Sequence, residues 1–456
     1  MPKIPTSRLA RTARFGGLVA GTGARWAGTT VANRMRSEEA ADAKSAERAM
    51  ATADALVARL GEMKGAAMKL GQVLSTIDWE LIPEDQRDDF KHRLAALRDD
   101  APKVPFSRLR KLIEEELGGP LTEHFAQFDE EARAAASIGQ VHHAVTHDGR
   151  EVAVKVQYPG VAEAVETDLR NIGILLPLVK RLAPGLDVKA IAAELRERIG
   201  EELDYEMEAQ NQRRVARHFR GHPFIRVPAV LTDLSSRRVL VTEWIHGQTF
   251  EEVKRLPEAD RDRFAEICFR FFYGLVERER LAAGDPHPGN YLLADDGRVA
   301  FLDFGLMRQM DAAYLEGEQH LARAVIAGDA DEVHRWMAEL GYLPDPEAFD
   351  PTRVLDQLSL AGEWYFTTGF RRLDPEYVRV ALEVGSSPRS PYFDEMRRMT
   401  VPPQALLLRR MEGLLFGVLG ELRAGADWGA LALEYIAEAE PTTALGRIEA
   451  EHFGAT

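Results

Sequence analysis

The sequence predicts an α+β fold, in which a helical N-terminal extension precedes a small sheet-bearing lobe and a helical C-terminal region. Three observations support this prediction. The chain from Glu38 to about Leu97 is rich in strong helix formers and has few helix breakers. Compact β-branched runs are concentrated between about Ala135 and Glu243. The remainder, to Thr456, has a mostly helical pattern.

The elements follow one another in a definite order. After a basic arm (1–37), we predict a helical extension (38–130), a sheet-bearing lobe (131–245) and a helical lobe (246–456). The predicted elements within them are a helix over 106–117, a strand over 151–156, a helix from 188 to about 219, a strand over 238–243, an apolar helix over about 261–280, and a hairpin of 291–293 with 299–302. In the long helix, Ile191, Leu195, Ile199, Leu203 and Met207 recur every fourth residue and predict one buried stripe.

The bulk composition is that of a globular protein with more than one core. The chain has 456 residues, 45% hydrophobic and 29% charged, and single cores rarely grow beyond about 250–300 residues. The net charge is −15 and the pI about 5.4. Nucleic-acid binding normally requires a basic face, so we expect no nucleic-acid partner. A nucleotide site remains compatible with this balance, because one pocket can be locally positive on an acidic protein.

The single cysteine and the N-terminal arm bear on location. Cys268 excludes an intramolecular disulfide and, inside an apolar run, is expected to be a buried core residue in a reducing compartment. The arm over 1–37 has seven basic residues and no acidic one. A solvated arm, a peripheral contact with anionic lipid and an organelle transit peptide all fit it. No run of about 18 apolar residues occurs, so we expect a cytoplasmic protein with no transmembrane helix.

Two motifs in the sheet-bearing lobe could bind phosphates. The Ala-rich stretch over 134–142 contains small residues whose backbone amides could approach phosphate oxygens, and its candidate contacts are Ala135, Ala136, Ser137, Gly139 and Gln140. An Ala-rich structural turn fits the same residues. In the strand, alternation directs Val152, Val154 and Val156 to the core, and Ala153 with Lys155 to the other face. Lys155 could reach phosphate oxygens if a carboxylate held it, and the candidates are Glu201, Glu202, Asp204 and Glu208.

Two further motifs could supply the catalytic base and the metal ligands. Asp285 and Asn290 have the D-x-x-x-x-N spacing of a kinase catalytic loop, in which the aspartate activates the attacking group. His287 within this loop is a weaker candidate base. The Asp303-Phe304-Gly305 string follows the hairpin, which returns Asp303 towards Asn290, so one carboxylate and one amide oxygen could share a hard cation.

Taken together, these motifs resemble the UbiB/AarF/ADCK family of atypical protein-kinase-like proteins. The resemblance covers about Leu60 to Arg308. It is carried by the K-x-G-Q motif Lys69–Gln72, the Ala-rich stretch, the loop Gly284–Asn290, and the acidic motif Glu202–Tyr205 followed by Glu208 and Ala209.

The resemblance implies a two-lobed protein-kinase-like fold that binds ATP and Mg²⁺. It implies that the K-x-G-Q segment lies over the active site, which places Lys69 and Gln72 near the nucleotide, with Glu202 and Asp204 beside them. Glu208 is the expected partner of Lys155, with Glu202 as the alternative. The family is associated with isoprenoid-quinone and lipid metabolism and with membrane surfaces, so a lipid or quinone-precursor ligand and a peripheral membrane contact are expected.

The sequence departs from related patterns in two places. Some bacterial members end in transmembrane helices, but the apolar stretch over 406–419 contains Arg409, Arg410 and Glu412. The arginine that precedes the catalytic aspartate in conventional kinases is missing before Asp285, and there is no A-P-E string. Stable membrane residence and conventional activation-loop control are therefore not supported.

The expected function is that of an atypical kinase or ATPase. Lys155 would hold the α- and β-phosphates, Asn290 and Asp303 the magnesium ion, and Asp285 would activate a hydroxyl or water. Glu243 lies in the expected hinge, Thr242–Trp244. Because the extension would block peptides, a lipid or small-molecule acceptor is favoured. A nucleotide-gated scaffold without catalysis is the alternative, and an aminoglycoside-type phosphotransferase is disfavoured by the K-x-G-Q motif.

Overall fold

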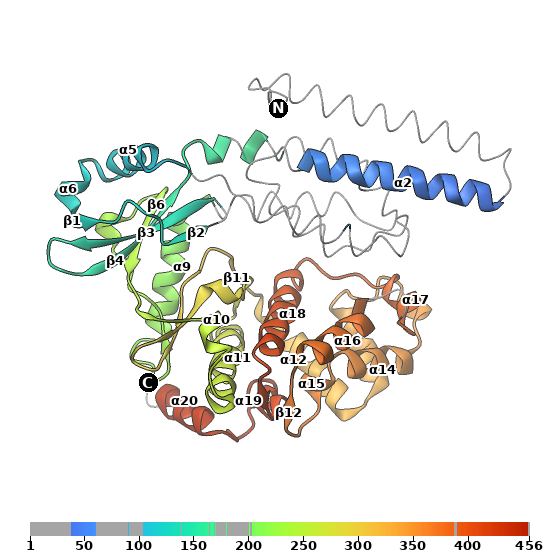
Figure 1. Cartoon of the computed structure of the whole chain (residues 1–456). Coiled ribbons are helices and arrows are strands. Elements are labelled where there is room, and N and C mark those ends of the chain that lie inside the picture. The colour runs from blue at the N-terminus through green and yellow to red at the C-terminus, as the bar shows by residue number, and fades with distance from the viewer. Residues whose placement is uncertain are drawn as a thin grey trace. The chain divides into compact units, whose positions relative to one another are not determined.

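The computed structural model describes residues 38–60, 90, 104–136, 138–163, 165–167, 169, 179, 200, 203–386 and 390–454. The chain divides into two compact units. The first comprises residues 1–207 with 231–242, and the second comprises 208–230 with 243–456. The described elements are drawn in Figure 1. The predicted boundary between the two lobes, at residue 245, lies close to residue 243, where the last stretch of the second unit begins. The segment 208–230 was predicted to lie in the sheet-bearing lobe but belongs to the second unit.

The first unit contains an antiparallel sheet, as predicted. Its strands lie in the order β1-β3-β4-β6, and β2 pairs with β3. Their bounds are Phe125–Phe128 (β1), Ala134–Ala136 (β2), Gly139–Thr146 (β3), Glu151–Gln157 (β4) and Val239–Glu243 (β6). The turn from β3 to β4 passes through Gly149, whose φ of 83° lies in the left-handed region that favours glycine. The β1 strand was not predicted, since four residues without clear alternation carry little signal.

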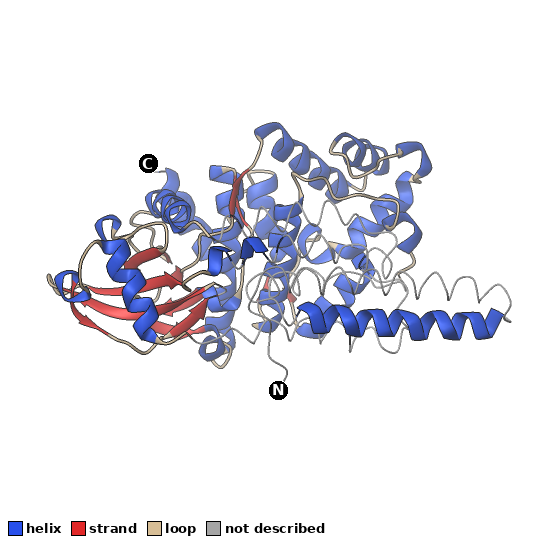
Figure 2. Cartoon of the chain, turned by 90° about the horizontal axis from the view of Figure 1, so that it is seen from above, coloured by secondary structure: helices blue, strands red, loops and turns tan. Residues whose placement is uncertain are grey.

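One face of this sheet is covered by a helix. Val152, Val154 and Val156 are fully buried, which confirms the predicted alternation. They pack against Leu109 and Ile113 of α5 (Phe106–Leu117), which lies across the sheet (Figure 2). The predicted bounds of α5 are confirmed, and Gly118 ends it in a left-handed conformation with φ of 76°. The unit also contains α2 (Glu38–Leu60) and α6 (Leu121–His124).

The predicted long helix from 188 to 219 is wrong as a single element. Asp204 lies outside any helix, and its Oδ1 accepts the backbone N–H groups of Glu206 and Met207, so it caps α9 (Tyr205–His218). Tyr205 at the start of α9 is buried, whereas Ile191, Leu195 and Ile199 of the predicted stripe lie outside the described residues. Met207, expected to be buried, is 46% exposed.

The second unit is built around the apolar helix α11 (Glu258–Glu279). It begins directly after Pro257, a residue that favours helix starts, and so extends further than the predicted 261–280 at this end. Cys268 is fully buried within it, as predicted, and burial raises the pKa of its thiol. The other described helices are α10 (Phe250–Val253), α12 (Ala312–Ala327), α13 (Ala330–Glu339), α14 (Pro351–Ala361), α15 (Glu363–Phe366), α16 (Pro375–Ser386), α17 (Phe393–Met396), α18 (Leu406–Glu421), α19 (Trp428–Ile436) and α20 (Ala444–Gly454).

Short strands in the second unit position the loops of interest. The predicted hairpin is confirmed as β9 (Tyr291–Ala294) and β10 (Val299–Phe301). Sequence patterns missed strands of two or three residues, which are too short to show alternation. These are β5 (Ile225–Arg226), β7 (Gly247–Thr249), β8 (Leu281–Ala283), β11 (Met307–Gln309), β12 (Arg371–Arg372) and β13 (Gly425–Ala426). Their sheets have the orders β5-β10-β9-β7, β11-β8 and β12-β13.

No helix in the described part of the chain is both long and apolar enough to span a membrane. The basic arm over 1–37 lies outside the described residues, so its three interpretations stay open.

Candidate active site

The Asp-x₄-Asn loop of the second unit is held in one shape by its own backbone. The N–H of His287 donates to the carbonyl of Asp285 at 2.7 Å, and the N–H of Asn290 donates to the carbonyl of His287 at 2.9 Å. The Asn290 Nδ2 also approaches the Asp285 carbonyl at 3.4 Å. The Nδ1 of His287 accepts the N–H of Gly289 at 3.1 Å, so this histidine braces the loop.

The hairpin brings Asp303 back to this loop, as predicted. The N–H of Leu302 donates to the carbonyl of Asn290 at 3.0 Å. This bond holds Leu302, which directly precedes Asp303, beside Asn290. The N–H of Gly305 then donates to Asp303 Oδ1 at 3.0 Å and orients the carboxylate.

Glu208 faces the same place from α9. A Cβ atom added to Gly305 would lie 3.5 Å from Asp303 Oδ1 and 3.7 Å from Glu208 Oε2, so both carboxylates border the space above this glycine. Glu208 is only 3% exposed. Nearby, Asn211 of the same helix donates to the carbonyl of Phe304 at 3.0 Å. Lys155 and Glu208 belong to different units, so their expected pairing stays a prediction.

Asp285, Asn290 and Asp303 line one small cavity. Its volume is about 10 Å³, room for about one water molecule or ion. Tyr291 also lines it, and its buried hydroxyl has no hydrogen-bond partner among the described residues. Burial raises the pKa of that phenol, so it stays neutral and able to donate.

The donor set of this cavity fits magnesium better than a transition metal. Carboxylate and amide oxygens are hard ligands, and protein magnesium sites commonly use one or two carboxylates together with substrate phosphates. Within the described ranges, no group of three or more His, Cys, Asp or Glu residues could hold a metal by itself. Asn290 and Asp303 could therefore hold a cation whose coordination is completed by phosphate oxygens.

Arg410 is a site residue that sequence reasoning missed. From α18, its Nε donates to the carbonyl of Gly284 at 2.8 Å, and its Nη2 lies 3.2 Å from Asp285 Oδ1. The guanidinium thus fixes the position of the Asp285 carboxylate and holds the start of the loop. The arginine that contacts Asp285 therefore comes from a distant helix. No local spacing signals it, because the two residues are 125 positions apart.

In the first unit, Lys155 lies on β4 over an aromatic ring. Its Nζ is 5.0 Å from the centroid of the Tyr205 ring, within cation–π range. Lys155 is half-buried and opposite Val141 on β3. The ring limits where the ammonium can point, which favours a positioned rather than a freely solvated lysine.

The Ala-rich stretch forms a tight hairpin rather than an open loop. Ala134, Ala135 and Ala136 form β2 and pair with Val141, Gln140 and Gly139. A Cβ atom at Gly139 would lie 2.2 Å from the carbonyl oxygen of Val156, so only glycine fits this close approach.

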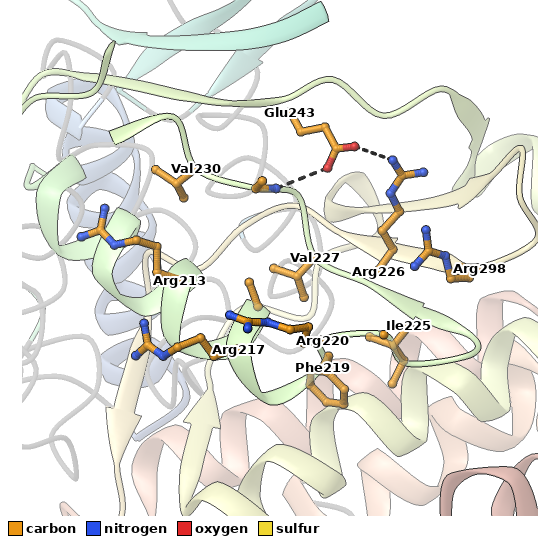
Figure 3. A pocket seen from close by; sticks show the side chains of 13 residues that line it. Arg213, Arg217, Phe219, Arg220, Ile225, Arg226, Val227, Val230, Glu243 and Arg298 are labelled. Carbon is orange, nitrogen blue, oxygen red and sulfur yellow. Dashed lines mark hydrogen bonds and ion pairs between the residues drawn. The ribbon is translucent and has the colours of Figure 1, made fainter. Parts of the chain in front are cut away.

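Several predicted contact residues have structural partners of their own. Gln140 is buried, and its Nε2 lies 2.8 Å from Nε2 of His142. Asp204 caps α9. In the second unit, the Glu243 carboxylate pairs with Arg226 at 2.5 Å (Figure 3). Lys69, Gln72, Ser137 and Glu202 lie outside the described residues, and their roles stay predictions.

The chain is similar to known atypical kinases. Residues 96–337 match the model of the ABC1 atypical kinase-like domain. The chain is 33% identical over 372 residues to the mitochondrial atypical kinase COQ8B of Danio rerio, covering 79% of this chain and 58% of that protein. It is 33% identical to COQ8B of Rattus norvegicus, covering 80% of this chain and 69% of the relative. The mitochondrial atypical kinase coq-8 of Caenorhabditis elegans is 31% identical, and the match covers 46% of its length.

A solved structure shares the fold. The complex of Rv3197 with erythromycin from Mycobacterium tuberculosis superposes with a TM-score of 0.63 at 32% identity, covering 87% of this chain and 98% of that one. The expected α+β, protein-kinase-like fold is thereby confirmed.

Proposed function

Because the chain belongs to the UbiB/AarF/ADCK family of atypical protein-kinase-like proteins, we propose that it is a magnesium-dependent, ATP-binding phosphotransferase or ATPase. One observation carries the proposal. Asp285, Asn290 and Asp303, which the motif spacing assigns to base and metal roles, line the same small cavity.

Each residue has a definite task in this proposal. Asn290 and Asp303 hold the magnesium ion, which when bound neutralises charge on the phosphate oxygens. Asp285, held in position by Arg410, orients and deprotonates the attacking hydroxyl or water. Lys155 contacts the α- and β-phosphates, and Glu208 positions that lysine. Catalysis then depends mainly on positioning and electrostatic stabilisation.

The acceptor is proposed to be a lipid or an isoprenoid-quinone precursor rather than a peptide. Family resemblance supports this choice, as do the relatives named as mitochondrial atypical kinases. If the acceptor is instead water, the protein is an ATPase whose turnover is coupled to such a ligand.

Phosphate release from ATP by the purified full-length chain tests the proposal. We expect release with Mg²⁺ and none with EDTA, and a higher rate with anionic vesicles or quinone-precursor phenols. Thermal stabilisation by nucleotide with no release under any of these conditions would overturn the catalytic role and favour the nucleotide-gated scaffold. Absence of any nucleotide binding would remove both functions.

A further inference from the structure

A second, larger cavity lies within the second unit, apart from the catalytic loop. Its volume is about 550 Å³, within the range of small-molecule sites, and Figure 3 shows its lining. Charged side chains line much of it: Arg213, Arg217, Arg220, Arg226, Arg298 and Glu243. The lining thus contains five guanidinium groups and one carboxylate. Because the whole chain has a net charge of −15, its overall composition does not explain this local excess of positive charge.

Three of these arginines come from one stretch of chain. Arg213 and Arg217 lie on α9, and Arg220 follows its end, a spacing of four and then three residues that places side chains on one helical face. In Figure 3 they lie on one side of the cavity, and Arg226 and Arg298 lie on the other.

Arg226 and Arg298, on the other side of the cavity, pair with nearby carboxylates. Glu243 Oε1 pairs with Arg226 at 2.5 Å, and its Oε2 accepts the N–H of Ala229 at 3.4 Å. Asp296 pairs with Arg298 at 2.6 Å and with Arg226 at 3.1 Å. The hydrogen bond from Arg298 is the main cause of the lowered pKa of Asp296, which is therefore ionised at neutral pH. Two carboxylates thus balance two guanidinium groups.

Two arginines of the helical side lack such a partner among the described residues. Arg217 and Arg220 are exposed, and neither guanidinium forms an ion pair or hydrogen bond with another described residue. Four apolar side chains also line the cavity, and we call them its apolar floor: Phe219 and Ile225, which are buried, and Val227 and Val230. The cavity therefore combines unneutralised positive charge with an apolar floor.

We propose that this cavity binds a small phosphate-bearing molecule whose organic part is partly apolar. Guanidinium groups present paired N–H donors that match phosphate oxygens, and bound phosphate would neutralise Arg217 and Arg220. The apolar floor would take the organic part. This chemistry is shared by a soluble phosphomonoester and by the headgroup region of an acidic phospholipid. The site is separate from Asp285, Asn290 and Asp303, and does not depend on the proposed catalysis.

The test compares the double variant Arg217→Gln/Arg220→Gln with a matched control, Arg335→Gln/Arg379→Gln. The control removes two exposed arginines from other helices of the same unit, with side chains 44% and 53% exposed. Phenyl phosphate binding is measured by calorimetry on the full chain, with a non-hydrolysable ATP analogue and Mg²⁺ present throughout. Sedimentation with phosphatidylcholine vesicles, with and without phosphatidic acid, forms the second arm.

We expect Arg217→Gln/Arg220→Gln to weaken binding of at least one probe tenfold or more, with the control unchanged. Loss of phenyl phosphate binding indicates a soluble ligand, and loss confined to phosphatidic acid vesicles indicates a lipid headgroup. Arg217 lies in the last turn of α9, where a basic residue can stabilise the helix. If this were its only role, the double variant would have a changed thermal stability but would bind both probes as the wild type does. Equal binding of both probes by wild type, variant and control would overturn the proposal, whatever the nucleotide turnover.

Discussion

Replacing Asp303 with asparagine is expected to lower magnesium-dependent nucleotide turnover by about 100-fold or more. The substitution keeps the shape of the side chain and an oxygen that can accept the N–H of Gly305, now at 3.0 Å. It removes the negative charge that would hold the cation beside Asn290. Turnover is measured as phosphate release at saturating ATP and Mg²⁺, and binding as thermal stabilisation by nucleotide.

Asp295→Asn is the matched control for this variant. Asp295 lies exposed in the turn of the same hairpin, and the change removes the same charge without touching the cavity. We expect the control to retain wild-type turnover. A rate for Asp303→Asn within about threefold of the control would mean that Asp303 does not hold a catalytic metal.

The largest stability effect is expected at Arg270, a fully buried cation of α11. Its guanidinium pairs with Glu266 at 2.8 Å, Glu434 at 2.7 Å and Glu449 at 3.0 Å. Thr443 accepts a further hydrogen bond at 3.0 Å. Arg270→Met would strand three carboxylates, and breaking a buried charge network in this way costs about 3–5 kcal/mol. For a domain of about 150–250 residues, that loss lowers Tm by roughly 6–20 °C.

Arg278→Met provides the control, on the same helix and facing one of the same carboxylates. Arg278 reaches Glu449 only at 3.8 Å, and its side chain is 35% exposed. Solvent screening limits such a pair to about 0–1 kcal/mol. Both variants are compared by calorimetry of the full chain. Equal Tm values for the two would show that the Arg270 network does not tie α19 and α20 to α11.

The parts of the fold that could be predicted from sequence are those with short-range causes. Alternating valines predicted β4, and the helix predicted over 106–117 matches α5 at both ends. The hairpin with a turn ending at Gly297, whose φ is 81°, brought Asp303 to Asn290 because a tight turn leaves few alternatives for register.

The parts that could not be predicted depend on contacts between residues far apart in the sequence, or on two local preferences that compete at one position. Arg410 reaches Asp285 across 125 positions, and no local pattern signals such a contact. The arginines of the larger cavity come from α9, β5 and the turn before β10, so their meeting is visible only after folding. At Asp204, a favourable helix cap outweighed the continuing apolar stripe that predicted an unbroken helix.

The central claim is that Lys155 and a metal ion held by Asp303 bind one and the same nucleotide. A double-mutant cycle on ATP affinity tests it most directly, with wild type, Lys155→Met, Asp303→Asn and the double variant, each measured with Mg²⁺ and with EDTA. We expect the two losses to be strongly non-additive with Mg²⁺, and the effect of Asp303→Asn to vanish in EDTA. Independent, additive losses, or full ATP affinity in Lys155→Met, would contradict the claim.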